Sequence, residues 1–455
     1  MFYWEDYLPV YMFITLAVLL FTGFPVAFIL GGLALAFGMI GWFVGLFSPI
    51  EFFNIIPRIW GGSADNLVLV AVPCFVFMGT MLERAGIANS LLHILQVLMR
   101  RIPGSMALGV TFMGTILAAT TGIIAASVTM MAVLALPPML RQGYNTELAT
   151  GTIAASSCLG ILIPPSIMLV IMADLLGISV GILFAAAVFP GLILSGLYTT
   201  YIVVVTSWRP HLAPALTLEQ MPASQRQTWE LVFKGFLPPI FLIFLVLGSI
   251  LGGVATPTEA GAVGAAGAII LAIVNRNLSG AILRDVVDRT SLIIGMVFFI
   301  LIAASSFSYV FRSLGGDEII VNAINATGLD SWGVLVLLMA TVFILGFFFD
   351  WIEISLIVLP VFAPVVEQFD FGTHIAGREV IYWFSILIAV NLQTSFLTPP
   401  FGFALFFIKG VAPPSVTMRH IYRGIVPFVA LQLIGLSLVL AFPQIAMWLP
   451  NQVFD

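Results

Sequence analysis

The chain has 455 residues, of which 61% are hydrophobic and only 8% are charged. Soluble domains carry about 25% charged residues, so 16 Lys and Arg plus 21 Asp and Glu are too few to solvate a protein of this length. The same figures exclude a disordered chain, because disordered segments are polar and rich in charge. With a mean hydropathy of +1.15, the composition indicates a protein that crosses a lipid bilayer many times.

The long apolar segments show no alternation of polar and apolar residues, which excludes a β-barrel and predicts an all-α fold. At about 20 residues per crossing, we expect about 10–12 transmembrane helices. Cys74 and Cys158 lie in apolar stretches and predict neither a disulfide framework nor a metal cluster. The net charge of −5 argues against a nucleic-acid partner.

The sequence carries no motif for chemistry on phosphate or peptide bonds. Its two lysines, Lys234 and Lys409, lie outside any G-x-x-x-x-G-K-[ST] pattern, so we expect no ATPase activity. The histidines are scattered and form no H-E-x-x-H, and no G-x-S-x-G is present. A transporter without cofactors is therefore the expected class, and a membrane-embedded enzyme is the alternative from another class.

The chain divides near its middle and its halves resemble each other. A polar stretch from Ser207 to Lys234 separates them. In each half, a long apolar segment with a proline turn, at 136–138 and at 359–364, is followed by a helix that we expect to break at a Pro-Pro pair. We place re-entrant hairpins at about 105–140 and 340–367, and the breaks at Pro164-Pro165 and Pro399-Pro400.

A Pro-Pro pair in a membrane helix removes two backbone donors and frees upstream carbonyl groups. Such carbonyls are tolerated at bilayer depth only when they are buried in protein or line a cavity. Discontinuous helices at corresponding positions of two halves indicate a transporter's binding site. Freed carbonyls and hydroxyls suit Na⁺, and the N-terminal ends of half-helices suit a carboxylate; two ordinary kinked helices are the structural alternative.

The few polar residues near these features are the candidate ligands. In the first half, Thr120, Thr121 and Gly122 are expected at the hairpin tip, and small-residue helix packing is their structural alternative. Close to the first break, we expect contributions from Ser156, Ser157, Gly160 and Ser166. Residues 156 and 160 share a helix face, so we predict a Na⁺ site between this break and the first hairpin.

In the second half, Asp350 and Glu353 lie three residues apart in an apolar run. Carboxylates inside a membrane are costly and usually functional, although either one could instead cap the hairpin. A polar cluster before the second break consists of Asn391, Gln393, Thr394, Ser395 and Thr398. In a dry setting these groups need partners, which favours a second Na⁺ site or the substrate.

Two further charged residues have a structural explanation. Glu259 follows Thr256-Pro257 and is expected to cap a helix start. Arg312 precedes Gly315-Gly316-Asp317-Glu318; it is a candidate for the substrate carboxylate, and pairing with the acidic residues is its alternative.

Several motifs along essentially the whole chain carry a family resemblance. They include the runs Gly23–Phe28, Met78–Arg84, Leu148–Ile153, Ile163–Ile167, Ala255–Ala260 and Asn391–Gly402. With these runs, the chain resembles the large membrane subunit of tripartite ATP-independent periplasmic (TRAP) transporters. The last two runs resemble the branch associated with mannitol and chloroaromatic compounds or with 2-oxo acids.

The resemblance implies an inverted repeat like that of the ion-transporter superfamily, in the inner membrane of a bacterium. It implies a soluble periplasmic binding protein that delivers a small organic anion, and a small four-helix membrane subunit that braces this chain. It also implies an elevator-type motion coupled to Na⁺. On this basis we expect scaffold helices at 1–104, transport-domain halves at 105–207 and 332–412, a linker with scaffold helices at 208–331 and a C-terminal helix at 413–455.

The resemblance assigns provisional roles to the candidates. Those expected to bind Na⁺ are Thr121, Gly122, Ser156, Ser157, Gly160, Asp350, Thr394, Ser395 and Thr398. Those expected to bind the substrate are Thr120, Ser166, Glu353, Asn391, Gln393 and Arg312. The alternative within the superfamily is a Na⁺/carboxylate symporter that works without a binding protein.

Overall fold

The computed structural model describes residues 4–99, 102–121, 124–214, 232–366, 368–399 and 402–454. Throughout these residues the regular structure is helical. Eight helices have the length and composition of membrane spans, and four shorter apolar helices accompany them. The all-α, multi-pass fold predicted from composition is therefore confirmed.

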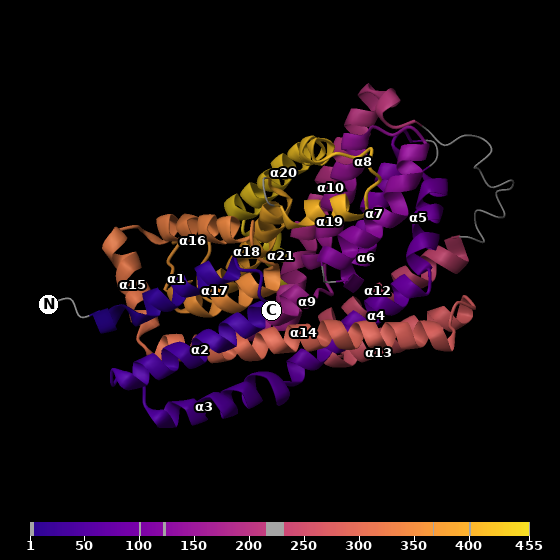
Figure 1. Cartoon of the computed structure of the whole chain (residues 1–455). Coiled ribbons are helices and arrows are strands. Elements are labelled where there is room, and N and C mark those ends of the chain that lie inside the picture. The colour runs from indigo at the N-terminus through magenta and orange to yellow at the C-terminus, as the bar shows by residue number, and fades with distance from the viewer. Residues whose placement is uncertain are drawn as a thin grey trace.

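A layer of long helices forms one side of the molecule (Figure 1). It contains α14, whose 34 residues extend for about 50 Å, and α14 packs against α2 and α4, while α4 packs against α13. The helices of this side are α1 (Leu8–Leu20), α2 (Val26–Phe43), α3 (Pro49–Ile59), α4 (Ala71–Arg84), α12 (Leu237–Leu251), α13 (Pro257–Val274), α14 (Gly280–Ser313) and α15 (Gly316–Thr327). Short helices η1 (Trp4–Tyr7), η2 (Trp60–Ala64), η3 (Leu67–Val70) and η7 (Val232–Phe236) connect to them.

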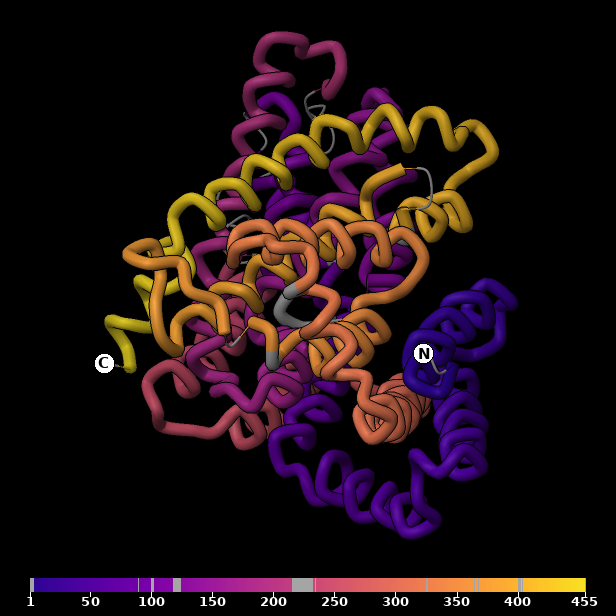
Figure 2. Tube along the Cα trace, turned by 90° about the vertical axis from the view of Figure 1, so that its left-hand side faces the viewer, coloured from indigo at the N-terminus to yellow at the C-terminus, as the bar shows by residue number. Residues whose placement is uncertain are grey.

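The remaining helices form a second body, which contains the hairpins and the broken helices. Figure 2 shows the N-terminal helices on one side and α20 on the opposite side. The members of this body from the first half are α5 (Ile87–Leu98), α6 (Ser105–Thr121), α7 (Ile124–Arg141), α8 (Thr146–Cys158), η4 (Leu159–Ile161), α9 (Ile167–Leu175), α10 (Val180–Trp208) and η5 (Pro210–Leu212). From the second half they are α16 (Ser331–Leu345), α17 (Trp351–Val366), α18 (Glu379–Leu397), α19 (Phe403–Val411), α20 (Met418–Ala441) and α21 (Gln444–Val453).

Both expected hairpins form, with two corrections. The first consists of α6 and α7, and the second consists of α16 and α17, so its first arm begins at Ser331 rather than near residue 340. The prediction that the chain turns at these prolines is wrong, because Pro137 and Pro138 lie inside α7 and Pro360 lies inside α17. A membrane helix continues through proline where neighbouring helices compensate the lost hydrogen bonds, and α7 packs closely on α8 and α19.

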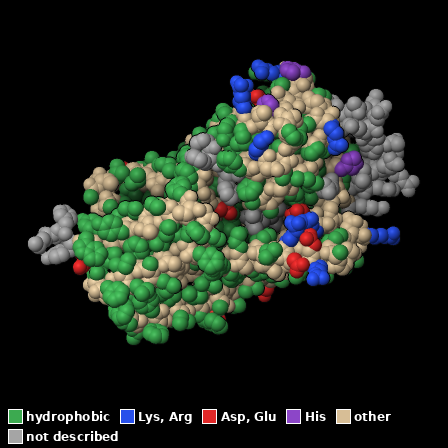
Figure 3. Space-filling view, viewed as in Figure 1, with side chains coloured by type: hydrophobic (Ala, Val, Ile, Leu, Met, Phe, Trp, Pro, Cys, Tyr) green, Lys and Arg blue, Asp and Glu red, His purple; other side chains and the backbone are tan. Residues whose placement is uncertain are grey.

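The surface separates into an apolar face and a charged end (Figure 3). Hydrophobic side chains cover the side that carries α1–α3, whereas Lys, Arg and His gather over the opposite end of the view. Large side chains on the apolar face, such as Phe53 and Phe21, are exposed. Because a bilayer solvates apolar side chains, this distribution fits a protein embedded in lipid.

Helix capping is predictable from sequence at one membrane helix. Thr256 and Glu259 form a capping box at the start of α13, in which the Thr256 backbone N–H donates to Glu259 Oε2 over 2.8 Å. The structural interpretation of Glu259 is thereby confirmed.

Candidate ion and substrate site

Both predicted helix breaks are present. The first broken helix consists of α8 and α9, with η4 and an irregular stretch between them. The second consists of α18 and α19, separated near Thr398 and Gly402. The first break contains Pro164 and Pro165, and the second contains Pro399, which fits the loss of backbone donors at proline; Pro400 lies outside the described residues.

Equivalent helices of the two halves make equivalent contacts, both within each half and between the halves. Within each half, the first hairpin arm packs on the helix before the break, so that α6 contacts α8 and α16 contacts α18. Between the halves, each half-helix after a break packs on the second arm of the other hairpin, so that α9 contacts α17 and α19 contacts α7. This exchange brings the two breaks close together, and α18 contacts both α8 and η4 of the first broken helix.

Close helix packing at glycines joins each hairpin to its broken helix. A methyl group at Gly114 of α6 would come within 2.6 Å of the Ser156 carbonyl oxygen. A methyl group at Gly346, directly after α16, would overlap with Ser395 Oγ. In each half, a glycine of the hairpin therefore lies against a serine of the helix before the break.

Polar contacts follow the same pattern in the first half. Ser156 Oγ donates to Thr111 Oγ1 of α6 over 3.3 Å. Ser127 Oγ of α7 donates to the Ser157 carbonyl oxygen over 3.3 Å, and Ser157 Oγ donates to the Ile153 carbonyl oxygen over 2.7 Å. Both hairpin arms thus reach the end of α8.

The remaining first-half candidates occupy the break itself or the hairpin tip. Gly160 is buried in η4, and Ser166 is the buried N-cap residue of α9, where its Oγ donates to the Ile161 carbonyl oxygen over 2.6 Å. Thr120 and Thr121 end α6, but their side chains lie outside the described residues, as does Gly122.

In the second half, Asn391 is the anchor between α18 and α16. Its Nδ2 donates to the Met339 carbonyl oxygen over 2.7 Å. The hydroxyls of Thr394, Ser395 and Thr398 donate to carbonyl oxygens of their own helix over 2.7 to 3.1 Å. Each hydroxyl oxygen keeps a lone pair that can accept a hydrogen bond or bind a cation.

Asp350 and Glu353 cap the start of α17. Asp350 Oδ1 accepts from the Trp351 backbone N–H over 2.7 Å, and Glu353 Oε2 accepts from the Asp350 backbone N–H over 3.3 Å. Asp350 also lies close enough to Cys158, the last residue of α8, to interact with it electrostatically. The connector of the second hairpin therefore reaches the first break. The capping alternative is what the structure shows, and a role in ligand binding stays a prediction.

Arg312 pairs with an acidic residue, which is the structural alternative to a contact with substrate. Its Nε lies 3.6 Å from Asp317 Oδ2, and its guanidinium also donates to the Pro360 carbonyl oxygen of α17. Its guanidinium is thus bound to the α14–α15 turn and the second hairpin, and a contact with substrate stays a prediction.

Several buried polar atoms near the breaks have no hydrogen-bond partner in the described part of the chain. They include both amide atoms of Gln393, Trp351 Nε1, Ser355 Oγ and Thr152 Oγ1. Buried polar groups are nearly always paired with protein, water or a ligand. The sequence did not predict a role for the following residues, because only tertiary packing distinguishes them from other membrane-helix residues: Thr111, Gly114, Ser127, Gly346, Trp351 and Ser355.

A polar cavity of about 740 Å³ lies between the two bodies. One wall is α7, from Ala126 near the first hairpin tip to Leu134, and the other is formed by α4 and α14. Arg84 and Arg289 line it, and both contact Asp285, at 3.0 Å and 3.2 Å. Glu83 and Thr129 also line the cavity, so charged and hydroxyl side chains extend toward the neighbourhood of the hairpin tip.

A membrane-embedded helical fold with paired hairpins, paired broken helices and a cavity between two bodies defines a multi-pass transporter. The family model of the DctM component of tripartite ATP-independent periplasmic transporters matches residues 13–445. The chain belongs to this family and is a large permease subunit of the bacterial inner membrane, not an enzyme.

Relatives of similar length agree with this assignment. The chain is 28% identical to the ectoine TRAP transporter large permease protein TeaC of Halomonas elongata, over 97% of this chain and 99% of that protein. It is 28% identical to the C4-dicarboxylate TRAP transporter large permease protein DctM of Pseudomonas aeruginosa, over 89% and 91%. It is 28% identical to the 2,3-diketo-L-gulonate TRAP transporter large permease protein YiaN of Escherichia coli, over 94% and 97%.

Among solved structures, the YdaH transporter of Alcanivorax borkumensis superposes with a TM-score of 0.59 at 14% identity and covers 88% of each chain. At this identity the similarity concerns the fold alone.

Proposed function

We propose that this permease subunit imports a small organic anion together with Na⁺. The observation that carries the proposal is the set of unpartnered buried polar atoms around the breaks, above all both amide atoms of Gln393. In a dry environment they need a ligand or water. The adjacent hydroxyls and freed carbonyls supply the oxygen ligands that a hard cation prefers.

The position of Asp350 suggests how ion and substrate act on each other. Asp350 caps the start of α17 and lies within electrostatic range of Cys158 at the end of α8, so its charge acts on both halves of the site. A Na⁺ ion bound there neutralises the carboxylate and lowers the repulsion that an organic anion meets on approach. Binding of ion and anion would then be mutually favourable, which is the requirement for symport.

The motion that we propose is an elevator movement of the hairpin body against the long-helix layer. The 740 Å³ cavity between α7 and the layer supports it, because the two bodies are not packed tightly there. Relative movement of two bodies around a site between repeats is the usual basis of alternating access.

We further propose two partners: a small membrane subunit and a soluble periplasmic substrate-binding protein. Family membership supports both, since the family is defined as one component of a tripartite periplasmic system. Relatives are named for ectoine, C4-dicarboxylates and 2,3-diketo-L-gulonate, so the chemical class is a small organic anion or zwitterion, and the mannitol/chloroaromatic or 2-oxo acid branch stays a prediction.

Uptake into proteoliposomes tests these points. The chain is reconstituted with and without its small subunit, and uptake is measured with and without the binding protein under an inward Na⁺, K⁺ or proton gradient. We expect uptake only with the Na⁺ gradient and the binding protein. Full uptake by this chain alone would replace the tripartite assignment with a self-sufficient symporter, and full uptake under a proton gradient in choline would replace Na⁺ with H⁺.

A further inference from the structure

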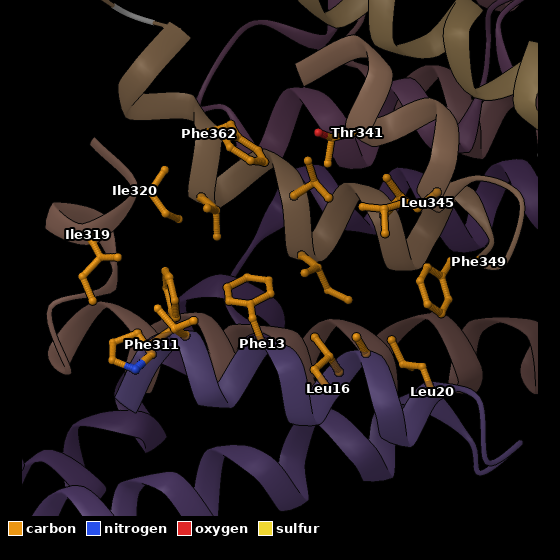
Figure 4. Close-up of a pocket in the computed structure, with 17 residues that line it drawn as sticks. Phe13, Leu16, Leu20, Phe311, Ile319, Ile320, Thr341, Leu345, Phe349 and Phe362 are labelled. Atoms are coloured by element: carbon orange, nitrogen blue, oxygen red, sulfur yellow. The ribbon is translucent and has the colours of Figure 1, made fainter. Parts of the chain in front are cut away.

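An apolar cavity of about 390 Å³ lies between α1 and the second hairpin (Figure 4). Phe13, Leu16 and Leu20 of α1 face Phe362, Leu345 and Phe349 across it. Thr341 is the single hydroxyl residue of its lining, and its Oγ1 already donates to the Leu337 carbonyl oxygen over 2.9 Å. The cavity therefore offers nothing to a polar ligand and favours a hydrocarbon.

The walls of the cavity are two continuous helix faces. On α1, the lining positions Pro9, Phe13, Leu16, Ala17 and Leu20 recur at helical spacing. On α17, Ile354, Ile357, Val358, Val361 and Phe362 do the same. The cavity is consequently an elongated channel between two helices.

The length and polarity of this channel match one leaflet of a bilayer. From Pro9 to Leu20, α1 rises about 16 Å, and half of the hydrocarbon core is about 15 Å thick. The Pro9 end follows the acidic residues Glu5 and Asp6 and the exposed Trp4, a composition typical of a membrane–water interface. The ion pair of Arg312 and Asp317 flanks the same end, next to lining residues Phe311 and Ile319.

The channel is also continuous with the lipid-facing surface. Ala17 lines it and is exposed, while Ile14 and Val18 on the adjoining face of α1 are 55% and 61% exposed. A chain of the surrounding bilayer can therefore enter sideways without crossing a polar barrier.

We propose that one acyl chain of a membrane phospholipid occupies this channel, with its headgroup at the Pro9 end. The chain end then lies against Leu20 and Phe349, and Phe349 directly precedes Asp350. The lipid fills the space between α1 and the second hairpin and supports the connector that holds Asp350. The inference rests on the membrane location and the cavity, and does not depend on Na⁺ coupling.

Tryptophan substitutions that fill the channel test the proposal. The full chain is purified from its membrane, and retained phospholipids are counted by native mass spectrometry. Ala17→Trp and Thr341→Trp fill the channel from opposite walls, and Val18→Trp and Val336→Trp place the same side chain on exposed positions of α1 and α16. We expect the first pair to lose one phospholipid per chain that the wild type and the second pair retain; equal counts in all five proteins would overturn the proposal.

A labelling experiment on the unmodified chain covers the case in which a filling variant does not fold. The chain is reconstituted in phosphatidylethanolamine and phosphatidylglycerol vesicles containing a phospholipid with a diazirine near the headgroup or near the chain end. We expect the first probe to label Val10 and Ile320, and the second to label Leu20 and Phe349. Labelling confined to exposed residues such as Ile14 and Val18 would contradict the proposal.

Discussion

Gly346 and Ser395 are in direct contact: a methyl group added at Gly346 would overlap with both Oγ and Cβ of Ser395. The contact joins the connector of the second hairpin to the last turn of α18, just before the second break. In the first half, Gly114 of α6 likewise lies against Ser156 of α8. The same small-residue contact thus holds each hairpin against its broken helix.

We expect Gly346→Ala to displace Ser395 and to raise the Na⁺ concentration needed for half-maximal uptake. The methyl group has no space at this position, so either the connector or α18 must shift. Gly196→Ala is the matched control, because nothing lies within 4 Å of the added methyl there. Uptake as a function of Na⁺ checks the prediction, and identical Na⁺ dependence in both variants would contradict it.

Asn391→Ala should destabilise the protein by about 1 kcal/mol, because it removes the hydrogen bond that joins Asn391 Nδ2 of α18 to the Met339 carbonyl oxygen of α16. Thermal unfolding in detergent measures this loss. Thr341→Ala on the same hairpin arm, where the hydroxyl bonds only to its own helix, serves as the control. If both variants unfold at the wild-type temperature, Asn391 does not anchor α18 to α16.

Asp350→Asn distinguishes the capping role of this side chain from the role of its negative charge. The amide oxygen can still accept from the Trp351 backbone N–H, so we expect little change in the unfolding temperature. A unit charge close to a cation contributes on the order of 1 to 4 kcal/mol, so Na⁺ affinity should fall at least about fivefold. Asp350→Ala should lower both the unfolding temperature and the Na⁺ affinity. An unchanged Na⁺ affinity in both variants would restrict the role of Asp350 to capping.

Gly424→Ala should reduce the amount of folded protein without a specific effect on Na⁺. Gly424 lies against the backbone of α8, where an added methyl group would overlap with the Glu147 carbonyl oxygen. Backbone cannot rotate away as a side chain can, and overpacking of this kind costs about 1 to 3 kcal/mol or more. Gly248→Ala, with nothing within 4 Å, is the control, and similar yields of both variants would contradict the prediction.

Thr129→Cys in the polar cavity should react with a membrane-impermeant thiol reagent, and the modification should block uptake. Thr152→Cys is the buried control. Both are made in a Cys74→Ala background, since Cys74 is partly exposed and Cys158 is buried. Equal reactivity at the two positions would show that the cavity is not open to water.

The sequence predicted those features that local chemistry determines. The breaks at Pro164-Pro165 and Pro399-Pro400 were predicted correctly, and the spacing of Thr256 and Glu259 matches the capping box at the start of α13. The turn predicted at Pro137 and Pro138 is absent, because packing on neighbouring helices keeps α7 continuous through these residues. The contacts of Ser156 with Thr111 and of Gly346 with Ser395 join segments that are far apart in the chain, and no single-segment pattern specifies such pairs.

The claim that the two breaks form a Na⁺ site is tested most directly by binding of radioactive Na⁺ to the purified full chain. We compare the wild type with Ser157→Ala, Ser395→Ala and the control Ser306→Ala, whose hydroxyl bonds to its own helix in α14. The account predicts saturable binding to the wild type and the control, and clearly weaker binding to the two break variants. Equal binding to all four proteins, or no saturable binding to the wild type, would contradict it.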